Sequence, residues 1–285
     1  DLAAAFGAPF VLDMRDLWLG PGGYEPPSPV HRAAHERLER RVTRAASAIV
    51  AVSDAMSDFL AQRHAVERGR IETIVNGFDA DDCLLAESSP ERGRIVIAHV
   101  GTVIRRNRPD LFFDALARAP RQSRWKELGV RFRFVGNLSP ATAARPELGG
   151  LLETTGLVPH EQAWRQTQSA AALLLLVGDY VARWGHNAKA FEYLRSGRPI
   201  LCLEETPDSN DGRLLRSIAA QPCVFAPLND AASVADGVDR IVAIAQQSPP
   251  PATPPAALDA FDRRTGAARL ASLLERVVVA SQRVP

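Results

Sequence analysis

The sequence predicts an α/β protein built on parallel sheets, and three observations support this fold class. Residues 171–177 form an uncharged apolar run of strand length, and residues 200–203 form another. Between them, Ala190, Phe191 and Leu194 share one face at helical spacing. Gly197 and Pro199 end this helix before the second strand. A strand, a helix and a further strand in this order are typical of a parallel pair with a crossover.

The composition excludes several classes of function. The chain has 285 residues, of which 46% are hydrophobic and 24% charged, so it can bury a core in one large or two modest domains. Its net charge of +1 gives no argument for nucleic acid as a partner. Cys83, Cys202 and Cys223 lack metal or redox spacing, so we expect reduced thiols and no metal site. Without a signal peptide or an apolar run of about 18 residues, we expect a cytoplasmic protein with at most peripheral contact to the inner face of a membrane.

The first segment runs to about residue 88. Residue 1 is Asp, and the small number of predicted strands leads us to expect that an N-terminal portion is missing. Residues 9–18 predict a strand that ends in a charged tip containing Arg15 and Asp16. Mutual ion pairing is a structural alternative to a functional role for this tip. Further strands are predicted at 48–52 and 71–75, and Ser53 caps the helix after the first of them.

An arginine-rich amphipathic helix is predicted over residues 31–46. Its arginines can contact anionic lipid. The alternative is a solvated face on which Glu36 and Glu39 balance the arginines. The predicted apolar stripe of this helix consists of Ala34, Leu38, Val42 and Ala45.

The second segment, from about residue 89 to 255, opens with a strand over residues 94–100 and a turn at Gly101. Gly101 permits close backbone approach, and Arg105, Arg106 and Arg108 concentrate positive charge at the carboxyl end of the strand. A diphosphate suits this charge, although each arginine alone could be solvated. No Gly-x-Gly-x-x-Gly follows the strand, which weakens a dinucleotide cofactor.

The loop before the central helix predicts an anion site with a carboxylate beside it. Ligands bind at the carboxyl ends of parallel strands, and the uncapped amides at a helix N-terminus attract anions. The residues at this helix N-terminus are His186, Asn187, Ala188 and Lys189. Glu192, one turn later, leans back toward the same opening, so the site suits nucleotide phosphates and ribose hydroxyls. The alternative is that Glu192 is solvated or pairs with Arg195.

Three motifs resemble those of glycosyltransferase family 4, in its bacterial surface-polysaccharide branch. Residues 189–200, Lys-x-Phe-Glu-Tyr-Leu-x-Ser-Gly-Arg-Pro-Ile, are similar to the donor-site helix motif of that branch. Residues 101–109 resemble its "G-T-x-x-x-x-x-R-x-P" loop, and residues 13–18, Asp-x-Arg-Asp-x-Trp, resemble its N-domain motif. The Asn-Gly turn at 76–77 resembles the connection at the interdomain boundary of these enzymes.

The resemblance implies an α/β GT-B fold in which two Rossmann-like domains face a cleft, the first of them incomplete here. Residues 1–88 would be the partial acceptor-side domain, and residues 89–255 the nucleotide-sugar-binding domain. Residues 256–285 would be a C-terminal helix that packs back on the first domain.

The implied function is a retaining transfer of a sugar from a nucleoside-diphosphate sugar, such as a UDP- or GDP-sugar, to a sugar or lipid-linked hydroxyl. No cofactor is expected, because Arg108 and Lys189 can stabilise the departing diphosphate without a metal. By resemblance, Glu192 binds the donor ribose, and Arg15 and Asp16 are catalytic. The donor-binding set is Gly101, Thr102, Arg105, Arg106, Arg108, His186, Asn187, Ala188, Lys189 and Glu192.

One departure from the wider family leaves alternatives open. A glutamate that contacts the donor sugar is expected eight positions before Glu192, where this chain has Trp184. The identity of the sugar therefore does not carry over. The alternatives are a GT-B nucleotide-sugar epimerase and a non-catalytic GT-B partner subunit. Among the remaining histidines, we expect His99 to be packed within its strand and His160 to begin a helix.

Overall fold

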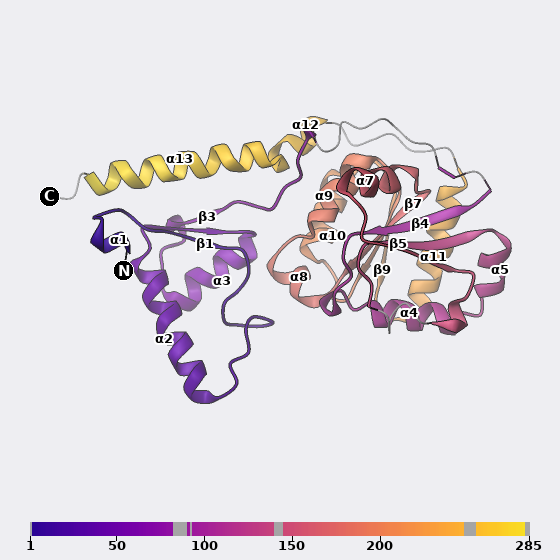
Figure 1. The fold of residues 1–285 in the computed structure, drawn as a ribbon, viewed down its shortest axis with the longest axis horizontal. Coiled ribbons are helices and arrows are strands. Elements are labelled where there is room, and N and C mark those ends of the chain that lie inside the picture. Colours follow the sequence, from indigo (N-terminus) through magenta and orange to yellow (C-terminus); the bar gives the residue numbers. More distant parts are fainter. Residues whose placement is uncertain (1, 82–89, 92, 140–144, 248–254, 283–285) are drawn as a thin grey trace. The chain divides into compact units, whose positions relative to one another are not determined.

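The computed structural model describes residues 2–81, 90–91, 93–139, 145–247 and 255–282. The chain divides into two compact units (Figure 1). Unit 1 comprises Asp1–Gly77, Arg183–His186 and Ala260–Pro285, and unit 2 comprises Phe78–Ala182 and Asn187–Asp259. The domain limit expected near residue 88 lies outside the described residues and stays a prediction, and Cys83 lies outside them as well.

Unit 1 is built on a three-stranded parallel sheet. Strands β1 (Val11–Met14), β2 (Ala48–Ala51) and β3 (Ile71–Thr73) lie side by side in chain order. Ser53 caps α3 (Asp54–His64) by accepting a hydrogen bond from the Met56 amide at 3.1 Å, as predicted. Leu273 of the C-terminal helix α13 (Arg263–Gln282) packs against residues of β2 and the end of β3. The remaining short elements are α1 (Leu2–Ala5) and the 3₁₀ turn η1 (Arg68–Arg70).

Helix α2 (Pro29–Ala45) forms as predicted, but the prediction of its buried face was wrong. Its buried residues are Glu39 and Thr43, whereas Leu38 is 46% exposed and Ala34 and Ala45 are also exposed. The reason is a polar interaction between helices, since the Glu39 carboxylate accepts hydrogen bonds from the Arg63 guanidinium on α3 at 3.1 and 3.2 Å. The helix therefore turns its arginine-rich, weakly apolar side outward.

The charge on Glu39 is satisfied inside unit 1 and does not balance the surface arginines. Glu39 is 1% exposed, and its second oxygen accepts the Leu19 amide at 3.2 Å. His64 lies 3.8 Å from the same carboxylate. Burial lowers the pKa of His64, and this desolvation outweighs the opposite effect of Glu39.

Unit 2 contains a six-stranded sheet in which every pair is parallel. The strand order is β6-β5-β4-β7-β8-β9, which is the doubly wound order with its reversal between β4 and β7. The strands are β4 (Ile95–Val100), β5 (Val130–Val135), β6 (Leu152–Gly156), β7 (Ala172–Val177), β8 (Ile200–Glu204) and β9 (Cys223–Pro227). The predicted α/β class is confirmed, although β6 was not predicted because its sequence has a single aliphatic residue and its surface is mostly exposed.

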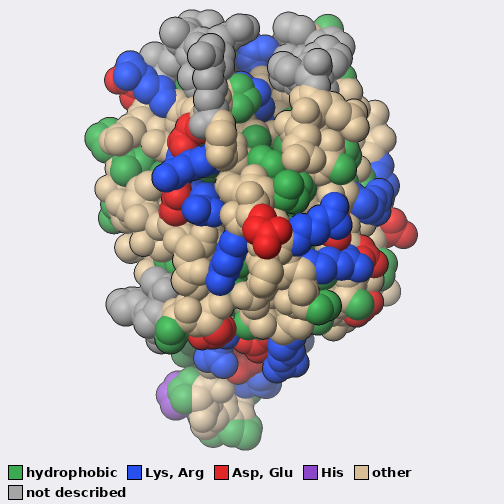
Figure 2. Space-filling view, turned by 90° about the vertical axis from the view of Figure 1, so that its right-hand side faces the viewer, with side chains coloured by type: hydrophobic (Ala, Val, Ile, Leu, Met, Phe, Trp, Pro, Cys, Tyr) green, Lys and Arg blue, Asp and Glu red, His purple; other side chains and the backbone are tan. Residues whose placement is uncertain are grey.

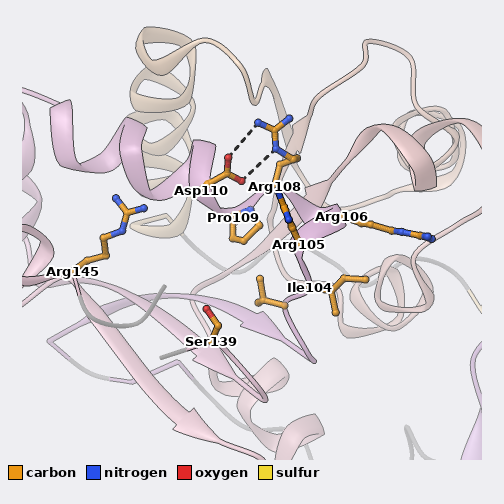
Figure 3. Close-up of a pocket in the computed structure, with 9 residues that line it drawn as sticks. Ile104, Arg105, Arg106, Arg108, Pro109, Asp110, Ser139 and Arg145 are labelled. Carbon is orange, nitrogen blue, oxygen red and sulfur yellow. Dashed lines mark hydrogen bonds and ion pairs between the residues drawn. The ribbon is translucent and has the colours of Figure 1, made fainter. Parts of the chain in front are cut away.

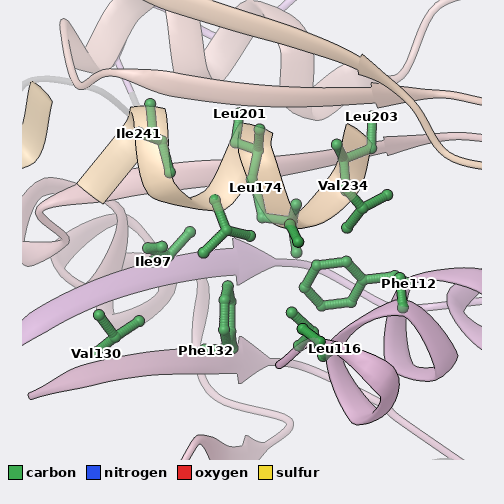
Figure 4. Close-up of a cluster of buried hydrophobic side chains, with 14 of the residues drawn as sticks. Ile97, Phe112, Leu116, Val130, Phe132, Leu174, Leu201, Leu203, Val234 and Ile241 are labelled. Carbon is green, nitrogen blue, oxygen red and sulfur yellow. The ribbon is translucent and has the colours of Figure 1, made fainter. Parts of the chain in front are cut away.

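Helices cover both faces of this sheet. On one face, α4 and α11 pack over alternate strand residues such as Ile97, Phe132 and Leu174 (Figure 4). The other face carries α7 and α9, which contact each other. The helices of unit 2 are α4 (Pro109–Arg118), α5 (Gln122–Glu127), α7 (His160–Ser169), α8 (Asp179–Trp184), α9 (Ala188–Ser196), α10 (Asn210–Ile218), α11 (Ala231–Ala245) and α12 (Pro255–Leu258), of which α8 runs on into unit 1. Short 3₁₀ turns are η3 (Arg105–Asn107), η4 (Pro146–Leu148) and η5 (Asp259–Phe261), the last of which also crosses into unit 1.

On the face shown in Figure 2, basic and acidic side chains are interspersed and do not form a field of one sign. Across the described residues, every helix is either too short or too polar to cross a bilayer. Cys202 is buried in β8 and Cys223 is partly buried in β9, and both are free thiols.

Candidate functional site

A cavity of about 260 Å³ lies where β4 ends and α9 begins, at the reversal of strand order in unit 2. We call it the α9 pocket. It brings together five of the predicted residues from two separate motifs: Gly101, Thr102, Ala188, Lys189 and Glu192. The other residues lining it are Val100, Val135, Gly136, Leu157, Val158, His160, Ala163, Trp164 and Thr167.

Two glycines allow the chain to close tightly around Lys189. A Cβ atom on Gly101 would lie 2.5 Å from the Lys189 Cε atom, and Gly101 has a φ of +115°. A Cβ atom on Gly136, whose φ is +126°, would lie 2.8 Å from the carbonyl carbon of Gly101. Only glycine fits both positions, because a side chain would displace Lys189 or the backbone beneath it.

The charge of Lys189 is held at the mouth of this cavity. Its Nζ atom donates to the Thr102 carbonyl oxygen at 3.4 Å. Desolvation lowers the pKa of Lys189, while the nearby carboxylates of Glu192 and Asp211 act in the opposite direction. A desolvated ammonium interacts strongly with an incoming anion because little water screens it.

Helix α9 presents its N-terminus to the same cavity. Gly197 ends the helix in a left-handed conformation with φ +68°, as the sequence predicted. The Tyr193 hydroxyl accepts the Val100 amide at 2.8 Å, which ties α9 to the end of β4. Asn187 is the N-cap residue, yet its side chain makes no capping hydrogen bond. Among the first-turn amides, that of Ala190 donates to the Asn187 carbonyl oxygen at 2.9 Å, and those of Ala188 and Lys189 receive no side-chain cap from Asn187.

Asn187 is instead held by Asp211, a residue for which the sequence analysis predicted no role in the site. Its backbone amide lies 3.1 and 3.2 Å from the two Asp211 carboxylate oxygens, and its Nδ2 atom donates to Oδ2 at 2.6 Å. Asp211 is fully buried in the first turn of α10. The sequence shows only an acidic residue at a helix start, which is common wherever a helix begins.

The α7 side of the pocket is largely apolar, with one unsatisfied donor. Trp164 is 4% exposed, and its Nε1 atom is buried with no hydrogen-bond partner among the described residues. His160 begins α7, as predicted, and also lines the pocket. His99 is buried in β4 as predicted, its Nδ1 lies 3.0 Å from the Leu174 carbonyl oxygen, and burial holds its pKa well below 6.5.

The three predicted arginines line a different cavity, of about 1040 Å³, shown in Figure 3. Arg108 is tied down there, since its guanidinium pairs with Asp110 at 3.2 Å and with Glu205 at 2.5 Å. These carboxylates raise the pKa of Arg108 and neutralise part of its charge. Arg145 lines the opposite side of this cavity from Arg106 (Figure 3).

Arg105 and Arg106 are the more available cations of that cavity. Both side chains are exposed, and Arg106 stacks on the Tyr180 ring with its guanidinium carbon 4.5 Å from the ring centroid. Within the described part of the chain, neither forms an ion pair. The buried Asn107 fixes the loop that carries them by accepting the Ile104 amide at 3.1 Å.

The predicted catalytic pair lies in unit 1, at the carboxyl end of its sheet. Arg15 pairs with Asp13 at 2.8 Å and donates to the Asn76 side chain at 3.2 Å. Asp16 is exposed next to it. The Arg15 side chain therefore links the ends of β1 and β3, in agreement with the ion-pairing alternative for this tip.

Trp184 and His186 belong to the short stretch that is counted with unit 1. The Trp184 ring packs on Phe59 with centroids 4.8 Å apart, and its carbonyl oxygen accepts the Ser53 hydroxyl at 2.8 Å. Trp184 is thus a packing residue of unit 1. His186 is half-buried. In the described residues, no group of three or more His, Cys, Asp or Glu side chains could hold a metal ion.

Comparison with known proteins shows which sequences and folds the chain resembles. Residues 1–77 match the model of a family described as "Glycosyl transferase 4-like domain". A sequence search of curated proteins finds no match. The fold is similar to HepE from Anabaena, solved in complex with UDP, with a TM-score of 0.66 and 16% identity over 96% of this chain and 74% of that chain.

Two other solved structures are similar to the chain over nearly its whole length. The α,α-trehalose-phosphate synthase (UDP-forming) from Burkholderia vietnamiensis has a TM-score of 0.67 and 13% identity, over 97% of this chain and 69% of that chain. Sucrose-phosphate synthase from Thermosynechococcus elongatus has a TM-score of 0.63 and 15% identity, over 98% and 70%. The chain therefore has the GT-B fold, and its residues 1–77 match the family described as "Glycosyl transferase 4-like domain".

Proposed function

We propose that the chain transfers a sugar from a nucleoside-diphosphate sugar to a hydroxyl group, with retention at the anomeric carbon, in the assembly of a surface polysaccharide or glycolipid. The observation that carries this proposal is the α9 pocket, where a cation, a helix N-terminus and a carboxylate surround one cavity at the strand-order reversal. HepE binds UDP, UDP with glucose and UDP-glucose in its solved structures, so UDP is the first nucleotide to test.

The donor binds in the α9 pocket in this proposal. Lys189 and the first-turn amides of α9 contact the diphosphate, and Glu192 accepts hydrogen bonds from the ribose hydroxyls. The barrier to reaction is departure of the diphosphate, so positive charge that is fixed before the reaction lowers it. Arg105, Arg106 and Arg108 remain proposed contributors to the same charge, although the cavity they line differs from that of Lys189.

Unit 1 supplies the acceptor side, with Arg15 and Asp16 in the catalytic roles. The interactions of Arg15 with Asp13 and Asn76 hold its guanidinium in place, so it is preorganised and loses little side-chain entropy on contact with a reacting group.

A lipid-linked acceptor would bring unit 1 to a membrane, and the exposed side of α2 supports this extension. Arg37, Arg41 and Arg44 are all exposed on this helix, while Glu39, one of its two acidic residues, is buried and paired and the other, Glu36, is half-buried. Clustered arginines near an anionic bilayer each contribute about 1 kcal/mol of binding.

The test is calorimetric titration of the chain with UDP and GDP, followed by a sugar-transfer assay with UDP- and GDP-sugars and with Glu192→Ala as the comparison. We expect one nucleotide to bind, with affinity that falls at least tenfold in the variant, because a hydrogen bond to a charged group contributes about 1.5–3 kcal/mol. Nucleotide binding without transfer to any acceptor would favour the non-catalytic partner subunit. Turnover of the donor sugar without an acceptor would favour the epimerase. Failure of every nucleotide to bind would overturn the proposal.

A further inference from the structure

The contact between Asn187 and Asp211 explains why the N-terminus of α9 is available to a ligand. Asparagine at an N-cap position normally turns its side-chain oxygen onto the amides of the first helical turn. Here the Asn187 side chain makes no such bond and donates to the Asp211 carboxylate at 2.6 Å. A residue that would close this helix end is thus held away from it.

Asp211 is placed firmly enough to hold Asn187 away. Its side chain is fully buried, and both oxygens accept from Asn187. The start of α10 is fixed in turn by the buried Glu204, which accepts the Ser209 amide at 3.1 Å and the Ser209 hydroxyl at 2.7 Å. The carboxylate is therefore positioned by the end of β8 before any ligand arrives.

We infer that Asp211 is a positioning residue for the donor diphosphate. By holding the Asn187 side chain, it leaves the Ala188 and Lys189 amides at the start of α9 without a side-chain cap, beside the Lys189 and Glu192 side chains. This inference rests on the proposed function, because it assumes that the diphosphate binds to that helix end. Asp211 itself does not contact the nucleotide.

The substitution Asp211→Asn separates this role from simple burial of a charge. Asparagine is uncharged and has an NH₂ group in place of one carboxylate oxygen, so it holds the amide and the Nδ2 group of Asn187 more weakly than the two oxygens of Asp211 do. The released side chain can then cap α9 and compete with the diphosphate. We expect UDP to bind about tenfold more weakly, since a capping interaction of this type corresponds to a factor of that size. Binding of uridine, which lacks phosphates, should change less than about twofold.

A second substitution supplies the rescue. Asn187→Ala removes the capping side chain, so in the Asp211→Asn background it should restore most of the lost UDP affinity. Asn187→Ala alone tests the inference even if Asp211→Asn does not fold, because loss of UDP binding in this variant would mean that the Asn187 side chain itself binds the diphosphate. The matched control is Asp239→Asn on α11, where the same change removes the charge of a carboxylate that accepts the Trp125 indole N–H at 2.7 Å and should leave both affinities unchanged.

Calorimetry with UDP and NMR titration with uridine on the full chain decide the question. A phosphate-dependent loss in Asp211→Asn that Asn187→Ala reverses supports the inference. Unchanged or tighter UDP binding in Asp211→Asn overturns it, as does equal weakening of UDP and uridine, or a loss that Asn187→Ala does not reverse. If Asn187→Ala alone abolishes UDP binding, Asn187 contacts the diphosphate directly and the inference is also overturned. Failure of the unchanged chain to bind UDP or GDP would instead overturn the proposed function.

Discussion

Replacement of Gly101 by alanine should weaken donor binding in addition to straining the backbone. An alanine Cβ at this position would lie 2.5 Å from Lys189 Cε, whereas ordinary van der Waals contact begins near 3.4 Å. The lysine side chain must therefore retreat by about 0.9 Å, and a displacement of that size at a reacting centre can cost about a hundredfold in activity. We expect UDP affinity to fall at least tenfold, which corresponds to about 1.4 kcal/mol.

The fold should also lose stability, and a second glycine isolates this backbone contribution. Gly150 also has a positive φ, +80°, but a Cβ atom there would meet nothing within 4 Å. Alanine at Gly150 should cost about 1–2 kcal/mol of unfolding free energy through backbone strain alone, with no effect on UDP. Calorimetry measures the affinities, and thermal unfolding should show losses of a few degrees for both variants. If Gly101→Ala binds UDP as tightly as Gly150→Ala does, the contact with Lys189 has no functional role and the reasoning fails.

Three further predictions concern the other described features. Below about pH 6.5 the unfolded chain protonates His99 while the folded chain does not, because burial lowers the pKa of His99 in the fold. The free energy of unfolding should therefore fall by about 1.4 kcal/mol for each pH unit below that value. Denaturant titration should show that this free energy falls less steeply with pH for His99→Gln. If the unpaired Trp164 indole N–H binds the ligand, Trp164→Phe should weaken UDP binding by about threefold to tenfold in calorimetry. An unchanged UDP affinity would show that Trp164 is not part of the site. Replacing Arg37, Arg41 and Arg44 together by glutamine should reduce the binding of the protein to phosphatidylglycerol vesicles at low salt about tenfold or more, measured by sedimentation, without loss of UDP affinity. Unchanged sedimentation would exclude α2 as the membrane contact.

The parts of the fold that local sequence determines were predictable. The limits of α9 follow from its apolar spacing and from Gly197, and the β-strands of the sheet centre follow from their uncharged runs. The association of residues 101–102 with 188–192 followed from the rule that parallel strands gather their carboxyl ends at one edge.

What the sequence could not show depends on contacts between distant segments. Glu39 is buried because Arg63, 24 residues away, reaches it, and no local pattern on α2 contains that partner. Asp211 likewise lies 24 residues from Asn187, and its role becomes visible only once α10 is seen beside α9. The arginines of residues 105–108 share one loop, yet the loop turns them into another cavity than that of Lys189.

The division of the chain has a practical consequence for any attempt to study its halves separately. The polypeptide passes from one unit to the other at residues 77–78, 182–183, 186–187 and 259–260. Neither half is therefore a continuous gene fragment. A fragment that stops before residue 260 lacks the helix that covers one side of the first sheet, and one that starts at residue 78 carries the tetrapeptide Arg183–His186 without its own folding partners. Isolated halves would have to be engineered with a linker replacing that tetrapeptide, and not simply truncated.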